Sequence, residues 1–247
     1  MPFQPMAPAD FSSTVDPAIA ALDSPDLEFA AIDAVIFDMG GVIIDLDYGQ
    51  TIAALSALSG LSVGEVGDRY AQHQQDPLFD DFETGRIDAI AFRAGLRKLL
   101  DMAPADRGGC SDAALDDAWN ALILHLPPGR IDWLRRLRGQ KRTFLLSNNN
   151  EIHLSRCDEL LRQVAGPDAT WSDLFERVYL SHQCGDRKPH GSLFQRVIEE
   201  NQLDPARTLF LEDTAQHLVG ARSVGLKTRR IYPGLDIRTL PLMDREH

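Results

Sequence analysis

Short apolar runs alternate with amphipathic stretches over much of this chain, and this alternation limits the folds that it can adopt. The apolar runs cover residues 34–38, 143–147, 178–181, 208–212 and 227–232. They lack a strict alternation of polar and apolar residues, as strands do when both faces of a parallel sheet are buried. Helical spacing appears between the later runs, at Ile131 and Leu134, at Leu160, Leu161 and Val164, at Leu193, Phe194, Val197 and Ile198, and over residues 215–224. The order of strands and helices predicts an α/β fold, a doubly wound (Rossmann-like) parallel sheet.

Residues 49–126 interrupt the alternation, because their pattern is only helical. One apolar stripe comprises Phe92, Leu96, Leu99 and Leu100, and a second comprises Leu115, Trp119, Leu122, Ile123 and Leu126. Such stripes predict a small helical bundle, which Pro127-Pro128-Gly129 ends. We therefore predict a helical cap at 49–126 inserted into an α/β core formed by 31–48 and 127–247. Residues 1–30, rich in Pro, Ala, Ser and Asp, are predicted to be an extension, with a helical turn after Asp16-Pro17.

Composition excludes several classes of protein. The 247 residues carry a formal net charge of −12, which disfavours nucleic acid as a partner because binding to phosphate backbones requires clustered Lys and Arg. The sequence shows neither a secretory signal nor an apolar stretch near the ~20 residues of a membrane span. Three cysteines, with no CxxC pair, indicate neither a disulfide framework nor a zinc site, so a cytoplasmic location is expected.

Polar residues follow the ends of the predicted strands in four places. These are Asp38, Ser147-Asn148-Asn149-Asn150, Arg187-Lys188-Pro189 and Glu212-Asp213. Each alone is as consistent with a turn or a helix cap as with a site. Together, at one edge of a parallel sheet, they supply a carboxylate nucleophile, hydroxyl and amide donors, a cation and a metal-binding carboxylate. This set suits phosphoryl transfer, in which Lys and Mg²⁺ neutralise charge on the transferred group.

The same residues resemble the motifs of the haloacid dehalogenase (HAD) superfamily, in the branch whose cap follows the first motif. The similarity rests on Phe37-Asp38-Met39-Gly40-Gly41-Val42, Leu146-Ser147-Asn148-Asn149-Asn150, Arg187-Lys188-Pro189 and Phe210-Leu211-Glu212-Asp213-Thr214. In the cap, Phe82-Glu83-Thr84-Gly85-Arg86-Ile87 resembles a helix–turn segment of that branch. In its core motifs the chain also resembles α-D-glucose-1-phosphate phosphatase-like proteins, which share Asp-x-Gly, Ser-Asn-x-Asn and a Tyr-Leu-Ser segment, here Tyr179-Leu180-Ser181.

The resemblance implies a role for each matching residue. Asp38 would attack phosphorus and form an aspartyl-phosphate, which water then hydrolyses. Ser147 and the backbone or side chain of Asn148 would hold the phosphoryl oxygens. Lys188 would neutralise charge on the nucleophile and the phosphate. The implied substrate is a small phosphorylated metabolite.

A magnesium ion is expected beside the nucleophile. Asp38, the backbone carbonyl of Gly40 and Asp213 would supply the protein ligands, since Mg²⁺ prefers a few oxygen ligands plus waters. Two residues depart from the family pattern here. Glu212 stands where Asp or Gly is common, and His217 stands where Asn or Asp is common. We expect His217 to be a surface or helix-capping residue.

Gly40 is the other departure, because many family phosphatases carry there an Asp that protonates the leaving group. Loss of such help typically costs ~10²–10⁴-fold in rate. Three explanations stay open: a less basic leaving group, as in a sugar 1-phosphate; a different acid, from the cap or from Asp45 or Asp47; or weak or absent catalysis.

The leading prediction is therefore a Mg²⁺-dependent phosphatase of a small phosphorylated metabolite, with a sugar 1-phosphate as one candidate. The alternatives are a non-catalytic HAD-fold binding or regulatory protein and, less favoured, a 2-haloacid dehalogenase. The sequence does not separate substrate contacts from core packing among the cap residues Tyr70, His73, Phe79, Phe82 and Trp119. It gives no oligomeric state.

Overall fold

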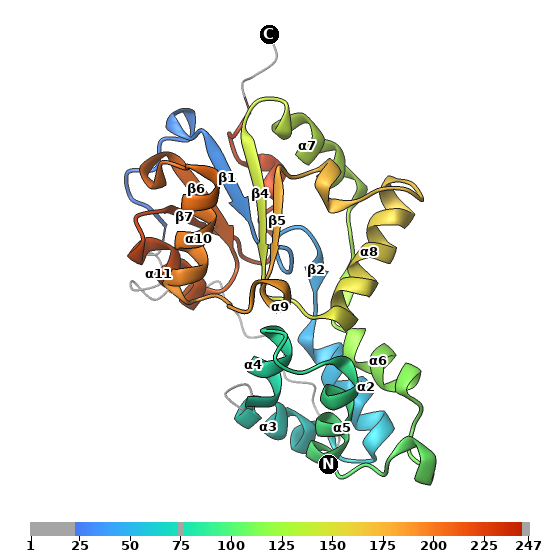
Figure 1. The fold of residues 1–247 in the computed structure, drawn as a ribbon. Helices are drawn as coiled ribbons and strands as arrows, with labels where there is room; N and C mark the ends of the chain where they lie inside the picture. The colour runs from blue at the N-terminus through green and yellow to red at the C-terminus, as the bar shows by residue number, and fades with distance from the viewer. Residues whose placement is uncertain (1–22, 74–76, 244–247) are drawn as a thin grey trace, which may run out of the picture.

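A five-stranded parallel sheet forms the centre of the molecule (Figure 1). The computed structural model describes residues 23–73 and 77–243. The sheet order is β5-β4-β1-β6-β7. The strands are β1 (Ala34–Phe37), β4 (Arg142–Ser147), β5 (Arg177–Leu180), β6 (Thr208–Glu212) and β7 (Lys227–Arg230). The predicted fold class is confirmed, and no predicted strand end differs by more than about two residues from the observed one, the imprecision expected of strand ends.

Both faces of the sheet are covered by helices, as the uninterrupted apolar runs predict. On one face, α7 (Pro128–Arg138) and α8 (Glu151–Ala165) pack with Val35 and Phe37 of β1. On the other, α10 (Gly191–Asn201) and α11 (Ala215–Ser223) pack with Ala34 and Ile36. Successive residues of β1 thus enter opposite cores, because side chains alternate across a strand. The central strand is thereby fixed in register, with Phe37 between Leu145 and Leu211.

The cap consists of helices that lie beyond the carboxyl edge of the sheet (Figure 1). They are α2 (Tyr48–Ser59), α3 (Val63–His73), α4 (Pro77–Glu83), α5 (Ala89–Leu99) and α6 (Asp112–Asn120). Their apolar sides form a separate core, in which the rings of Phe82 and Phe92 stack at 4.0 Å between centroids. This burial of aromatic surface stabilises the bundle, and Ile152 of α8 joins the same cluster.

The end of the cap differs from the predicted helix. The second apolar stripe extends to Leu126, but α6 ends at Asn120 and Ile123–His125 forms strand β3. This strand pairs antiparallel with β2 (Asp45–Leu46), so a two-stranded ribbon joins the cap to the core. The Thr51 hydroxyl donates to the Trp119 carbonyl and accepts from the Leu122 N–H at 2.9 Å, which takes the Leu122 N–H away from a continuing helix. The helical spacing of Leu122 and Ile123 was therefore coincidental.

The segment before β1 runs along the outer edge of β7. The Ser24 N–H donates to the Thr228 carbonyl at 2.9 Å, and Asp23 accepts from the Arg230 N–H at 2.6 Å. An uncovered edge strand offers unpaired backbone groups to other chains, so this segment protects the sheet from edge pairing.

Residues 1–22, which include the predicted turn after Pro17, lie outside the described residues. Within 23–73 and 77–243, every helix is too short or too polar to cross a bilayer.

Candidate active site

Asp38 lies where β1 ends, at the carboxyl edge of the sheet. Its backbone N–H donates to the Leu211 carbonyl at 3.0 Å, so the residue is held in line with the strand, and its side chain accepts from the Met39 N–H at 2.7 Å. The turn that follows requires glycine at Gly41, which has φ +71°; a Cβ there would lie 2.3 Å from Asp213 Oδ2. The glycine turn thus allows a second carboxylate to approach the first.

The space beside Gly40 is filled by another side chain. A Cβ at this position would lie 2.6 Å from Leu46 Cδ1. Leu46 belongs to the ribbon that joins cap and core, so a residue with an acidic side chain at position 40 would have to displace it. Leu46 therefore occupies the space that an acidic side chain at position 40 would need.

Lys188 is fully buried between two carboxylates. Its Nζ is 2.8 Å from Asp38 Oδ1 and 2.6 Å from Glu212 Oε2. Burial alone would lower the pKa of Lys188, but the two carboxylates hold that pKa above its ordinary value. The lysine is therefore a fixed positive charge in direct contact with the predicted nucleophile.

Ser147 is the last residue of β4 and Asn148 follows it, and both line the same cavity as Asp38. The Asn148 side chain makes hydrogen bonds to both the carbonyl and the N–H of Lys188, each at 2.9 Å. Its amide group is thus committed to holding the Lys188 backbone. The Ser147 hydroxyl makes only a long bond, at 3.3 Å, to the Asn148 carbonyl, and it remains well placed to contact a ligand.

Glu212, which stands where Asp or Gly is common in the family, has both carboxylate oxygens engaged within the protein. Its Oε1 accepts from the N–H groups of Asp213 and Thr214, and its Oε2 contacts Lys188 and the His217 ring. Burial would raise the pKa of Glu212, but Lys188 and His217 hold it below its usual range. The longer side chain reaches the lysine and the start of α11 at the same time.

The prediction for His217 was wrong. The ring is not on the surface: only 15% of the side chain is exposed, and Nδ1 lies 2.9 Å from Glu212 Oε2. The cause is local, because α11 begins at Ala215 and its first turn brings His217 back over the end of β6. Sequence spacing gave no sign of this contact, since it depends on the rotamer of Glu212.

Three carboxylates, from Asp38, Glu212 and Asp213, each place an oxygen within 4.8 Å of the others. Burial, together with Glu212, raises the pKa of Asp213 to about 7 and raises that of Asp38 well above its usual range. One lysine does not balance this charge, and a divalent cation with a preference for oxygen would. The donor set therefore fits Mg²⁺. Glu212 has both oxygens engaged within the protein, which leaves Asp38 and Asp213 as the available carboxylates.

The cavity over these groups lies between the core and the cap. It has a volume of about 420 Å³ and includes Ser147, Asn148, Arg187 and Asp213 on the core side. From the cap it is lined by Tyr48, Tyr70, Phe79, Glu83 and Trp119. Of the aromatic residues that the sequence left open, Tyr70, Phe79 and Trp119 reach the cavity, whereas Phe82 is buried in the cap core. The side chain of His73 lies outside the described part.

The other acidic residues considered as replacement acids do not line this cavity. Asp45 pairs with Arg130 at 2.6 Å and with His125 at 3.1 Å. Asp47 caps α2 by accepting from the Gly49 N–H at 2.9 Å. Both carboxylates therefore have structural roles where cap and core join.

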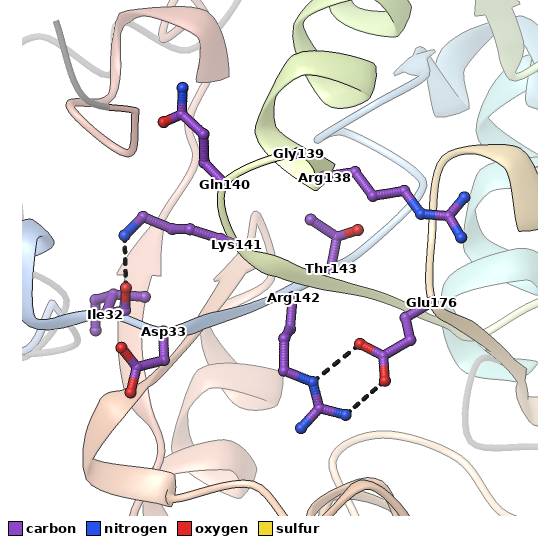
Figure 2. Close-up of a pocket in the computed structure, with 9 residues that line it drawn as sticks. All are labelled: Ile32, Asp33, Arg138, Gly139, Gln140, Lys141, Arg142, Thr143 and Glu176. Atoms are coloured by element: carbon purple, nitrogen blue, oxygen red, sulfur yellow. Dashed lines mark hydrogen bonds and ion pairs between the residues drawn. The ribbon is translucent and has the colours of Figure 1, made fainter.

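A separate cavity of about 480 Å³ lies at the opposite edge of the sheet, where β1 and β4 begin (Figure 2). Its charged groups bond within the protein: Arg142 donates to both oxygens of Glu176, and Lys141 donates to the Ile32 carbonyl at 2.6 Å. These contacts hold the amino ends of the strands together. The cavity itself is distant from the carboxylate cluster.

His153, in the first turn of α8, stacks on Trp119 with 5.0 Å between ring centroids and bonds Asn120 through Nδ1. Burial lowers the pKa of His153 to about 3, so the ring is neutral in the folded protein, whereas in the unfolded chain it titrates at its ordinary 6.5. Between these values the unfolded chain binds more protons. The free energy of unfolding is therefore expected to fall by roughly 1 kcal/mol per pH unit below about pH 6.5.

Urea unfolding in EDTA at pH 7 and pH 5, on wild type and His153→Gln, checks this expectation. The variant keeps a polar side chain next to Asn120 but lacks the titrating ring. Other groups titrate in both proteins and cancel in the difference, so wild type should lose more stability than the variant at the lower pH. Equal losses in the two proteins would contradict the prediction.

Comparison with known proteins agrees with the fold. Residues 32–225 match the family model of the haloacid dehalogenase-like hydrolases. D-ribitol-5-phosphate phosphatase of Bacteroides thetaiotaomicron is 26% identical over 84% of this chain and 95% of its own length. A phosphatase of Mycobacterium tuberculosis is 26% identical over 80% and 86% of the two chains.

A solved structure extends the similarity to a metal complex. The HAD family enzyme of Bacteroides thetaiotaomicron, in complex with magnesium and inorganic phosphate, is 28% identical and has a TM-score of 0.72, covering 83% of this chain and 97% of its own. The family match spans both the core and the cap of the present chain. The chain belongs to the haloacid dehalogenase-like hydrolases and is an enzyme of that family, in a group whose named relatives are phosphatases.

Proposed function

We propose that this enzyme is a Mg²⁺-dependent phosphatase of a small phosphorylated metabolite, and that the phosphoryl group passes through Asp38. The observation that carries the proposal is the contact of 2.8 Å between Asp38 Oδ1 and Lys188 Nζ, beside Asp213 and in a cavity that cap residues also line. A buried carboxylate with a fixed cation beside it is arranged to attack an anionic group. The magnesium and phosphate complex of the related HAD enzyme supports the same chemistry.

Each core residue has a defined task in this proposal. Asp38 attacks phosphorus and is released when water hydrolyses the aspartyl-phosphate. Lys188 lies against the attacking oxygen and offsets negative charge as the bond forms, while the Ser147 hydroxyl donates to a phosphoryl oxygen. Asn148 acts through Lys188, by fixing its backbone at two points.

Asp38, Asp213 and the Gly40 carbonyl would hold Mg²⁺, which supplies charge neutralisation for the phosphoryl oxygens. Burial in a crowded carboxylate set already raises the pKa of Asp38 and of Asp213. A cation would reverse both shifts by favouring the ionised forms. Binding of the metal is thereby coupled to ionisation of the nucleophile.

The cavity supports a small substrate. Its volume of about 420 Å³ suits a metabolite and leaves no room for a polymer. The net charge of −12 argues against nucleic acid. A polyol phosphate, by analogy with the ribitol-5-phosphate enzyme, and a sugar 1-phosphate are the candidates to test first.

All three cysteines are free thiols, which supports a reducing, cytoplasmic location.

Phosphate release from a panel of sugar, polyol and aryl phosphates tests the proposal. Turnover is expected with Mg²⁺, is expected to fall to background in EDTA, and should return when Mg²⁺ is restored. Halide release from a 2-haloacid without phosphatase activity would favour the dehalogenase alternative. No turnover of any phosphate, with no calorimetric signal for Mg²⁺ binding, would favour a binding protein.

A further inference from the structure

We propose that Glu83, at the end of cap helix α4, protonates the leaving group in place of the acid that Gly40 does not supply. The inference rests on the proposed phosphatase function and concerns the identity of its general acid. It assigns a catalytic role to a cap residue that lines the same cavity as Asp38.

Glu83 lies on the side of the cavity toward which the leaving group would depart. Among the described residues that line the cavity, the carboxyl groups belong to Asp38, Asp213 and Glu83. The first two are at the sheet edge, on the core side. In an in-line displacement the leaving oxygen lies opposite the attacking one. Since Asp38 attacks from the core, the leaving oxygen points toward the cap, which is where Glu83 lies.

The contacts of Glu83 leave it free to exchange a proton. Its Oε2 is shielded from solvent and lies 3.0 Å from Arg187 Nη2, but in the described part of the chain it accepts no hydrogen bond. Burial raises the pKa of Glu83, and Arg187 opposes this shift. Such a group can hold a proton before the reaction, and its carboxylate is stabilised by the adjacent guanidinium after the proton has left.

Other proton-bearing groups around the cavity are less suited. His153 is neutral, with its pKa lowered by burial to about 3. The Cys157 thiol has its pKa raised by burial to about 12, and the pKa of the half-exposed Tyr48 is also raised. His217 is engaged with Glu212 on the core side. A carboxyl group whose pKa is raised by burial can act as a general acid near neutral pH, and Glu83 has that character.

The proton balance closes over the two half-reactions. In the first, the bond from Asp38 to phosphorus forms, the bond to the leaving oxygen breaks, and that oxygen takes the proton of Glu83. In the second, Glu83 accepts a proton from the attacking water. The bond from water to phosphorus forms as the bond to Asp38 breaks. Inorganic phosphate leaves, and Asp38 and Glu83 return to their starting states.

The test compares two leaving groups in Glu83→Gln. An alkoxide needs a proton on departure, whereas 4-nitrophenolate does not. The kcat/KM of the variant is expected to fall at least ~10²-fold for the best alkyl phosphate of the panel, and less than ~5-fold for 4-nitrophenyl phosphate. Glu83→Asp keeps the carboxyl group and should recover part of the activity on the alkyl substrate.

Asp80→Asn is the matched control. Asp80 lies on the same helix and pairs with the same Arg187, at 3.3 Å, but it does not line the cavity. It is expected to affect both substrates equally and slightly. Equal losses on both substrates in Glu83→Gln, with an active wild type, would show that Glu83 only holds the cap to the core. That result would overturn the assignment and leave the proposed function standing.

Discussion

Replacing Asp38 by Asn is expected to abolish turnover, with a fall of at least ~10⁴-fold in kcat, as removal of a catalytic nucleophile commonly does. The Asn amide keeps the volume of the side chain but is a very poor nucleophile toward phosphorus. The measurement is phosphate release with Mg²⁺ on the best substrate of the panel. Asp45→Asn removes a carboxylate of the same type outside the cavity and should retain activity.

The stability of Asp38→Asn is not expected to fall with its activity. Burial and the neighbouring carboxylates raise the pKa of Asp38, so its charge is unfavourable in the protein without metal. Lys188 retains Glu212 as a partner when Asp38 is neutralised. Urea unfolding in EDTA should therefore show unchanged or increased stability, and added Mg²⁺ should stabilise the variant less than wild type. Activity near that of wild type would exclude Asp38 as the nucleophile.

The sheet was predictable because each of its strands is a short run of mostly apolar residues that can be recognised in the sequence. Ala34, Val35, Ile36 and Phe37 are all apolar since both faces of β1 are covered. The strand ends then followed from the polar residues after them, and parallel topology brought Asp38, Ser147, Lys188 and Asp213 to one cavity or its wall. Topology alone was sufficient for this part of the site.

The parts that the sequence did not predict depend on side-chain geometry between distant elements. Leu46 fills the space beside Gly40 from a ribbon that pairs residues about 80 positions apart, and helical spacing hid that ribbon. Glu212 contacts both Lys188 and His217. These contacts depend on the rotamer of Glu212, which the spacing of residues in the sequence does not predict. Glu83 belongs to a recognisable cap segment, but only the folded structure shows that it lines the cavity.

Replacing Lys188 by Met is expected to lower the free energy of unfolding by about 3–5 kcal/mol in EDTA at pH 7, because it leaves buried charge without its partner. Lys188 is fully buried, and its ammonium group is shared between Asp38 and Glu212 and lies 5.4 Å from the centre of the Phe210 ring. Methionine fills similar volume, so the loss reports the charge rather than a cavity. Turnover should also fall to near background.

Adding Glu212→Gln to the Lys188→Met protein separates this electrostatic cause from a packing defect. Glu212 has no solvent exposure, so neutralising it removes the larger part of the uncompensated charge. The double variant should therefore be more stable than Lys188→Met alone, a coupling that urea unfolding of the full mutant cycle measures directly. Catalysis should stay lost, because the cation beside Asp38 is still missing. Additive losses in the two single variants would mean that the lysine and the glutamate contribute independently, and the shared-charge account of the site would fail.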